Sequence, residues 1–547
     1  MSLNSSKGKI VNLCCLFPTP EYPFYHIQLL LQLDNDSEYC VTDVSVNGNQ
    51  VIDYVTCLNG KPLEDLKLKQ WGRSEVVIRY GWKCGEKLSV TIRALGEEKN
   101  KPLEIKAEGT APSYGGYWDP SWKYFAGVVC SETAGIDREC EPVHVTLALY
   151  TDRISDPARE LRMVSVDPCT GLHQQIQCQV YNVSRYECKR PDQRYQPTTV
   201  FEVAFLANVP AHSSRVYLAF YGNPQAPFPE YPGGLKVGGE GLGLTVENQY
   251  YCARLAPTSG AIDEIDVKMG VNRTFAHHLE TNGALHWNPG VYAPPRPWLH
   301  ASDWNPPRDY SHIKGNLLTM TRRSGPLDNY PEVEVSITYY FYNHLPWILM
   351  SSTIEVTKDI AVKALRNGEI VLNRELVDEF AWHKPGGGFD SMVITDGPRH
   401  PKHAKVLPCI TPWVCFFSRE NRCGLGVITV NLANFKNDGG LVRTFQPYTY
   451  LQWGPWYYYA RPLVYTFVSN NPGRLVNVPR GNVYYEKMAV VPMRVDDLNH
   501  SSTYLEKLYF CLSNPLQVKV AEDTDPRAPR GWMPPILVKE FEEMEEA

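Results

Sequence analysis

Short alternating or apolar runs recur along the chain and dominate its sequence pattern. Three of them are SVTIRAL (89–95), RVYLAFY (215–221) and EVEVSITYYFY (332–342), and each is followed directly by Gly or Asn. Successive side chains of a strand point to opposite faces, so such runs predict strands that contribute to a core. The only helices we expect are short, around 500–508 and in the acidic tail. The pattern therefore predicts an all-β fold of sandwiches or barrels.

The chain of 547 residues exceeds the size at which a single core stops growing, so several domains are expected. Two segments rich in Gly and Pro, 109–122 and 222–241, have the composition of linkers. They predict an N-terminal β-sandwich (1–108), a second β-sandwich or barrel-like unit (123–222), a large β region with the expected active site (242–515) and a C-terminal extension (516–547). No repeat of fixed period is present, which argues against a propeller or a solenoid.

Charge and hydropathy exclude two classes of partner. The net charge is -6, with both signs mixed along the chain, so no nucleic-acid partner is expected. No run approaches the roughly 18 apolar residues of a transmembrane helix, so no membrane partner is expected. The N-terminus is interpreted as a first strand rather than a signal peptide, and the 15 cysteines contain no CxxC pair. We therefore expect free thiols and a cytoplasmic location, with secretion as the alternative.

Residues 243–269 read GLTVENQYYCARLAPTSGAIDEIDVKM. This stretch resembles the opening strands of the galactose-mutarotase-like β-supersandwich, with a V-x-N-x-Y strand, a strand ending in P-x-S-G, and then A-I-x-x-I. In physical terms it is a hairpin with a tight turn at Ser259 and Gly260. The resemblance implies that 242–515 form a large sandwich of the kind found in polysaccharide lyases, carbohydrate epimerases and glycoside hydrolases.

The two β units before that region look like accessory domains of rhamnogalacturonan-exolyase-like proteins. The chain departs from that group because it has no helical segment long enough for an α/α-toroid, so the catalytic residues of the toroid have no counterpart here. The resemblance covers roughly half of the chain and bears on fold more than on activity.

The stretch 277–312 concentrates histidines and aromatic residues in a segment too rich in proline for a helix. It holds five of the chain's 14 histidines, with three tryptophans and two tyrosines. A long loop of this composition is typical of a binding or active site. The alternative is a covering loop whose aromatic side chains seal the edge of the sandwich.

Cleavage of a uronate glycoside by β-elimination needs a group that neutralises the C5 carboxylate, a base for the C5 proton and an acid for the leaving oxygen. The window 277–312 and the stretch 367–388 supply these residue types. The candidate catalytic residues are His286, His300, Tyr310, His312, Arg374 and His383. For the second stretch, a surface strand pair with a satisfied ion pair is an equal alternative.

Sugar rings stack on aromatic faces, and LQWGPWYYYARP (451–462) is the second aromatic cluster of the chain. On a strand, Tyr458 faces away from its two tyrosine neighbours, so one face is core and the other is free for stacking. The candidate substrate-binding residues are Trp287, Arg296, Trp298, Trp304, Trp456, Tyr458 and Arg461.

A divalent metal ion is the one cofactor that the sequence raises. His277 and His278 are adjacent, so on a strand they face opposite sides. His278 and Glu280 share a face and form the candidate metal pair, with His286 or Asp303 as a third ligand.

The leading hypothesis is a carbohydrate-active enzyme, a polysaccharide lyase that cleaves a uronic-acid-containing glycan by β-elimination. Its expected partner is a polysaccharide or oligosaccharide substrate. A glycoside hydrolase is one alternative, and its candidate carboxylates are Asp303, Glu375, Asp378 and Glu379. A non-catalytic glycan-binding protein is the other. The chain has no GxSxG, HExxH or P-loop motif. These absences argue against an α/β-hydrolase with a nucleophilic serine, a zinc protease and a nucleotide-binding P-loop protein.

Overall fold

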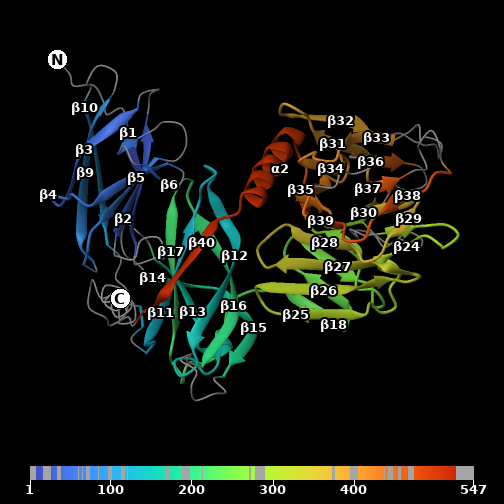
Figure 1. Cartoon of the computed structure of the whole chain (residues 1–547), viewed down its shortest axis with the longest axis horizontal. Coiled ribbons are helices and arrows are strands. Elements are labelled where there is room, and N and C mark those ends of the chain that lie inside the picture. Colours follow the sequence, from blue (N-terminus) through green and yellow to red (C-terminus); the bar gives the residue numbers. More distant parts are fainter. Residues whose placement is uncertain are drawn as a thin grey trace. The chain divides into compact units, whose positions relative to one another are not determined.

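The computed structural model describes most of the chain. The described residues are 8–16, 26–33, 38–58, 61–63, 66–68, 74–83, 85–96, 102–111, 118–119, 121–166, 173–187, 197–211, 213–269, 273–276, 290–372, 376–394, 404–436, 438–440, 448–453, 457–465 and 473–524. The chain forms two compact units (Figure 1). Unit 1 comprises 1–231 and 514–547, and unit 2 comprises 232–513. The division falls inside the Gly/Pro-rich segment 222–241.

The all-β expectation is confirmed, because the described elements are nearly all strands. The α-helices among them are α1 (Pro157–Glu160) and α2 (Leu498–Ser513), so the helix expected around 500–508 is present and longer. The acidic tail lies outside the described residues. Neither helix has the length and apolar character needed to span a bilayer.

Unit 1 begins with two sheets that enclose a core of alternating apolar side chains. The first sheet has the order β1 (Gly8–Leu16), β2 (His26–Leu33), β8 (Ser74–Arg79), β5 (Tyr54–Leu58) and β6 (Lys61–Leu63). The second has the order β10 (Pro102–Thr110), β9 (Lys87–Gly96), β3 (Tyr39–Val46) and β4 (Asn49–Gln50), with β7 (Lys67–Leu68) paired to β3.

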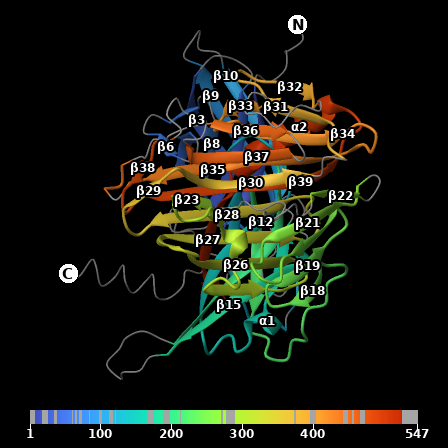
Figure 2. The same ribbon diagram turned by 90° about the vertical axis from the view of Figure 1, so that its right-hand side faces the viewer.

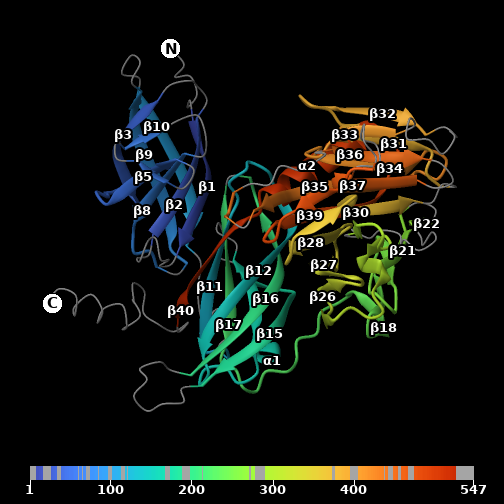
Figure 3. The same ribbon diagram turned by 45° about the vertical axis from the view of Figure 1, so that its right-hand side comes forward.

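Two further sheets of unit 1 form a second sandwich (Figure 3). The five-stranded sheet has the order β14 (His173–Ile176), β13 (Arg162–Val166), β17 (Ser214–Tyr221), β11 (Tyr124–Ser131) and β40 (Gln517–Thr524). The three-stranded sheet has the order β12 (Arg138–Tyr150), β16 (Thr198–Val209) and β15 (Cys178–Tyr186). The strand from the expected C-terminal extension, β40, completes this sandwich by pairing antiparallel with β11.

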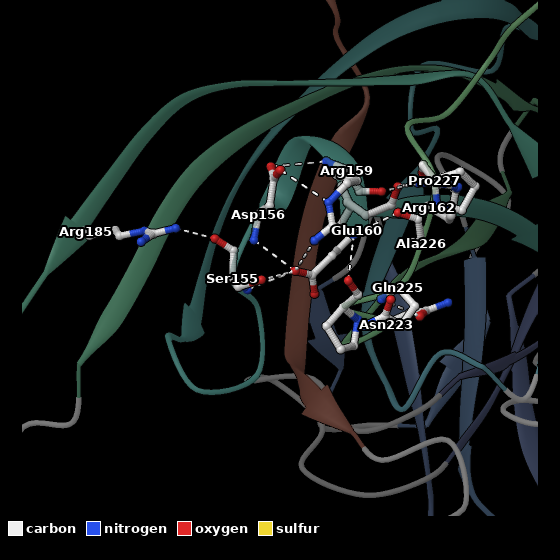
Figure 4. Close-up of polar contacts among 12 residues, drawn as sticks. Ser155, Asp156, Arg159, Glu160, Arg162, Arg185, Asn223, Gln225, Ala226 and Pro227 are labelled. Atoms are coloured by element: carbon white, nitrogen blue, oxygen red, sulfur yellow. Dashed lines mark hydrogen bonds and ion pairs between the residues drawn. The ribbon is translucent and has the colours of Figure 1, made fainter.

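Arg159 of α1 and Arg162 of β13 hold the start of the Gly/Pro-rich segment (Figure 4). Arg159 donates hydrogen bonds to the carbonyl oxygens of Pro224 and Ala226, at 2.7 and 2.8 Å. Arg162 donates one to the carbonyl oxygen of Pro227 at 2.6 Å. Backbone carbonyls outside a ladder need donors of this kind, so the segment is fixed to unit 1 at least as far as Pro227.

Unit 2 is built around a nine-stranded antiparallel sheet whose central strands lie side by side in Figure 2. Its order is β25 (Asp309–Ile313), β26 (Leu318–Leu327), β27 (Tyr330–Tyr342), β28 (Ile348–Val356), β39 (Val483–Arg494), β35 (Cys423–Phe435), β34 (Trp413–Ser418), β31 (Glu379–His383) and β32 (Phe389–Val393).

Three smaller sheets complete unit 2. The six-stranded sheet has the order β24 (Leu299–His300), β23 (Gly290–Tyr292), β30 (Ala364–Leu372), β37 (Tyr457–Tyr465), β36 (Tyr448–Trp453) and β33 (Ala404–Pro408). The five-stranded sheet has the order β18 (Lys236–Glu240), β19 (Gly243–Glu247), β20 (Tyr251–Leu255), β21 (Ile262–Val267) and β22 (Arg273–Ala276). The two-stranded sheet pairs β29 (Ile360–Val362) with β38 (Val476–Val478).

Alternation along the strands places the core of unit 2. In β27, Val333, Val335 and Ile337 are fully buried, while the residues between them are partly exposed. These side chains join one apolar cluster with residues from the six- and five-stranded sheets. The hairpin expected from 243–269 is present, because β20 pairs with β21 and Gly260 takes a φ of +69° in the turn.

Candidate functional site

The described part of the histidine-rich window adds two short strands to the edge of the six-stranded sheet. Strand β23 pairs with β30, which places Gly290 opposite Arg366, and β24 pairs with β23, which places His300 opposite Gly290. The chain then makes a single 3-10 turn, Ala301–Asp303. This register brings His300 and Arg366 together from positions 66 residues apart.

His300 is held on both sides of its ring. Its backbone N–H donates to Oδ2 of Asp303 at 2.7 Å, and its Nδ1 lies 3.4 Å from the same oxygen. On the other side, Nη2 of Arg366 donates to Nε2 of His300 at 2.7 Å. A guanidinium can only donate, so Nε2 of His300 is the acceptor of this contact. His300 is 8% exposed and Arg366 is 6% exposed.

Aromatic rings cover the pair. Tyr292 stacks on Trp298 with ring centroids 5.5 Å apart and an interplanar angle of 10°, and Trp298 stacks on His300 at 5.8 Å. The Cζ of Arg366 lies 4.8 Å from the centroid of Trp298, a cation–π contact. Tyr292 and Trp298 are only half-buried, so this stack is accessible to a ligand.

Gly290 makes the close packing possible. A Cβ at this position would overlap Cδ2 of His300 and would lie 3.2 Å from Nε1 of Trp298. Only glycine leaves room for both rings at this point of the strand. We call the group formed by Gly290, Tyr292, Trp298, His300, Asp303 and Arg366 the histidine–arginine cluster.

Two other residues of the window serve the framework around the cluster. Arg296 donates to Glu332 at 2.9 Å and lies over the ring of Tyr330, with Cζ 4.3 Å from its centroid. Trp304 is 2% exposed, belongs to the core of unit 2, and donates to the carbonyl oxygen of Pro326 at 2.8 Å. Neither side chain is part of the histidine–arginine cluster.

Tyr310 and His312 lie on a different sheet from His300. Both belong to β25, at the edge of the nine-stranded sheet, and alternation puts them on the same face. Tyr310 is 50% exposed and His312 is also exposed. With Arg322 they line a small depression in the surface.

His383 and Arg461 take part in contacts between elements of unit 2. Nε2 of His383 lies 3.5 Å from Oε2 of Glu506, an oxygen that also accepts a hydrogen bond from Nε1 of Trp413 at 2.8 Å, so both tie α2 to the sheet. Arg461 forms a 2.5 Å ion pair with Glu486, which joins β37 to β39. Both members of that pair are less than 5% exposed.

Asp378 and Glu379, two of the four carboxylates considered for hydrolysis, both contact Arg419. Glu379 forms an ion pair with Arg419, whose Nη2 donates to Oε2 at 2.9 Å. Asp378 accepts the backbone N–H of Arg419, and burial raises the pKa of Asp378.

The remaining candidates lie outside the described residues. They are His278, Glu280, His286, Trp287, Arg374, Glu375 and Trp456, together with the side chain of Tyr458. The metal pair is therefore among them. On the sheet, Leu372 is the register partner of Tyr457, which also pairs with Trp453. Leu372 is the last described residue before Arg374, and Trp453 and Tyr457 are the described residues on either side of Trp456.

Arg366 and Gly290 were not predicted from the sequence as site residues. Arg366 lies in ALRNGEIVL, a strand that begins and ends with apolar residues, and a charged residue in a buried strand is expected to have a partner. Gly290 follows Pro289 and has no distinguishing sequence context, because its importance depends on the rings that pack against it.

No protein-family model and no curated protein matches the sequence. Among solved structures, an alpha-mannosidase from Enterococcus faecalis V583 is similar over 73% of this chain and 46% of its own, with a TM-score of 0.44 and 10% identity. The chain thus spans about half the length of the mannosidase. A galactose mutarotase related enzyme from Lactobacillus acidophilus is similar over 46% of this chain and 98% of its own, with a TM-score of 0.29 and 10% identity.

The periplasmic domain of YidC from Thermotoga maritima is similar over 50% of this chain and 97% of its own, with a TM-score of 0.23 and 10% identity. At these TM-scores the likenesses carry no argument about activity, and the fold rests on the sheets themselves. The likeness to rhamnogalacturonan-exolyase-like proteins stays an expectation.

Proposed function

We propose that the chain is a carbohydrate-active enzyme that cleaves a uronic-acid-containing glycan by β-elimination at the histidine–arginine cluster. One observation carries the proposal. A guanidinium and the acceptor nitrogen of a neutral imidazole lie 2.7 Å apart beside a half-exposed aromatic stack. A cation, a base and a stacking surface are what uronate elimination needs in one place.

Arg366 has the role of neutralising the C5 carboxylate of the sugar. Its planar fork binds a carboxylate through two hydrogen bonds, and neutralisation makes the C5 proton easier to remove. When the carboxylate becomes the acceptor for Arg366, Nε2 of His300 loses its present donor. The binding of substrate thereby frees the base.

His300 then takes the C5 proton on Nε2. The electron pair left at C5 forms the C4=C5 double bond while the bond from C4 to the leaving oxygen breaks, and that oxygen takes a proton. Asp303, 3.4 Å from Nδ1, stabilises the imidazolium that forms. Tyr292 is the phenol of the cluster and the proposed donor to the leaving oxygen. Its stack with Trp298 gives the sugar ring a flat surface.

The test is a screen of the purified full chain against polysaccharides with and without uronic acid. A conjugated C=C bond in the product raises the ultraviolet absorbance, and the proposal predicts this rise for a uronate-containing substrate alone. New reducing ends without a rise in absorbance would show that the enzyme cleaves by hydrolysis and not by β-elimination. Binding without either product would show a non-catalytic glycan-binding protein.

A further inference from the structure

The second sandwich of unit 1 contains an open cavity of about 510 Å³ that the proposed function does not use. It lies where ends of the five-stranded and three-stranded sheets meet, and Arg215, Tyr217, Ser165 and Gln174 are among its lining residues. Cavities of roughly 300–1,000 Å³ are typical of small-molecule sites. We call it the Arg215 pocket.

Strand register brings its polar side chains together. On β17, Val216 and Leu218 face the first core of unit 1, so Arg215 and Tyr217 face the space between the two sheets of the second sandwich. Ser165 on β13 is the register partner of Tyr217. Three neighbouring strands thus present a polar row at this end, because Gln174 on β14 pairs with Ser165.

Arg215 has no ion-pair partner in the described part of the chain. Its Nη1 is buried and has no hydrogen-bond partner, and no carboxylate in the described part of the chain lies within ion-pair distance of the guanidinium. Leaving a buried donor unsatisfied costs about 1–3 kcal/mol, and more for a charged group. Because Arg215 lines the pocket, an anionic ligand there would pair with its charge.

Arg138, a second arginine of the same pocket, has a structural role. Arg138 forms ion pairs with Glu132 at 2.9 Å and Glu141 at 2.6 Å, and it donates to the carbonyl oxygen of Asn514 at 2.7 Å. Its charge is fully compensated by groups of the chain. Among the described residues, by contrast, the buried Nη1 of Arg215 has no hydrogen-bond partner.

We propose that the Arg215 pocket binds the carboxylate of an acidic sugar, a hexuronate unit of a glycan. The guanidinium fork matches a carboxylate, and the ring of Tyr217 and the side chain of Ile176 supply apolar wall for the sugar ring. Two exposed carboxylates, Asp137 and Glu139, also line the pocket. Carboxylates can accept hydrogen bonds from the hydroxyl groups of a sugar, and they repel a doubly charged phosphate more strongly than a singly charged carboxylate.

This inference rests on the pocket's own residues and not on the histidine–arginine cluster. It assigns a glycan-binding role to the second sandwich of unit 1, whatever reaction unit 2 carries out. If both proposals hold, the chain recognises the same class of sugar at two separate sites.

Calorimetric titration of the full chain tests the inference with a matched pair of sugars, galacturonate and galactose, which differ at C6. We expect galacturonate to bind at least about tenfold more tightly, the effect of one charge-assisted contact. The Arg215→Met variant should lose this preference, and Arg215→Lys should keep part of it. Arg185→Met, which removes an exposed arginine of β15, should keep the parent's affinity.

Two results would overturn the inference. One is equal affinity for both sugars, or tighter binding of phosphate or glycine than of galacturonate. The other is a preference that survives in Arg215→Met and vanishes in Arg366→Gln, which would place uronate binding at the histidine–arginine cluster alone. Loss of the preference in Arg215→Met but not in Arg366→Gln supports the Arg215 pocket, even if the screen finds no lyase activity.

Thermal unfolding of the same variants separates a ligand site from a structural one. Removing an unpaired charge should leave the Tm of Arg215→Met at or above the parent's value, because no described residue forms an ion pair with it. A fall of several degrees would assign Arg215 to the framework of the sandwich and contradict the inference.

Discussion

Arg366 donates a hydrogen bond to Nε2 of His300 across 2.7 Å, although both side chains can carry a positive charge. The contact requires a neutral imidazole, because a guanidinium cannot accept a hydrogen bond and Nε2 must therefore be unprotonated. A general base must be unprotonated before it acts, so the arginine holds the histidine in the form that catalysis requires. The same arginine is the natural partner of a substrate carboxylate, which links substrate binding to release of the base.

The packing of Gly290 predicts a selective effect of one methyl group. Gly290→Ala places a Cβ against the rings of His300 and Trp298, and we expect a loss of about 1–3 kcal/mol in the free energy of unfolding, the usual cost of overpacking. Activity should fall with it as the cluster shifts. Denaturant unfolding and turnover measure both effects. Gly238→Ala is the matched control, because nothing lies within 4 Å of its Cβ, and equal effects at both glycines would contradict the packing argument.

The buried ion pair between Arg461 and Glu486 predicts strong coupling between two sheets of unit 2. Glu486→Gln leaves the guanidinium of Arg461 buried without its charge partner, and such a loss costs about 3–5 kcal/mol. Replacing both residues, by Met and Leu, should cost less than the sum of the single changes. A double-mutant cycle from denaturant unfolding gives the coupling energy, and additive effects would show that the pair does not hold the sheets together.

We predict that the buried thiol of Cys415 is unreactive in the folded protein. Burial raises its pKa to about 12, so the reactive thiolate is negligible at pH 8. Because the folded state holds this proton more tightly than the unfolded state does, the contribution to stability is present below about pH 8.5 and is lost as pH rises towards 12. Alkylation at pH 8, located by mass spectrometry, should label Cys415 only after unfolding. Labelling of the native protein at the unfolded rate would refute this.

The strands were predictable because each depends on a local pattern. The run 332–342 alternates in sequence and appears as β27, with Val333, Val335 and Ile337 buried as the period requires. The hairpin around Gly260 was predictable for the same reason, since the turn residue and the flanking apolar residues are neighbours in the chain.

The composition of the site was less predictable, because it depends on register between distant segments. His300 and Trp298 were expected from the composition of their window, but Arg366 reaches them only because β23 pairs with β30. Trp304 looked similar to Trp298 in sequence, yet it lies in the core, where its indole N–H finds a carbonyl oxygen. The composition of 277–312 identified the segment that contains the site. Which of its residues belong to the histidine–arginine cluster, and which to the surrounding core, is decided by the pairing of strands.

The most direct test of the central claim is the rate of unsaturated-product formation by Arg366→Gln on the uronate substrate that the screen identifies. We predict a fall of about 10²-fold or more in kcat/KM, the effect of removing a principal charge-stabilising group. The control variant Arg480→Gln, which changes an exposed arginine of the same unit, should keep the parent's rate. Arg366→Lys, which keeps the charge but not the fork, should recover part of the loss, with unchanged circular dichroism as the check on folding. A folded Arg366→Gln protein with the parent's rate would contradict the account.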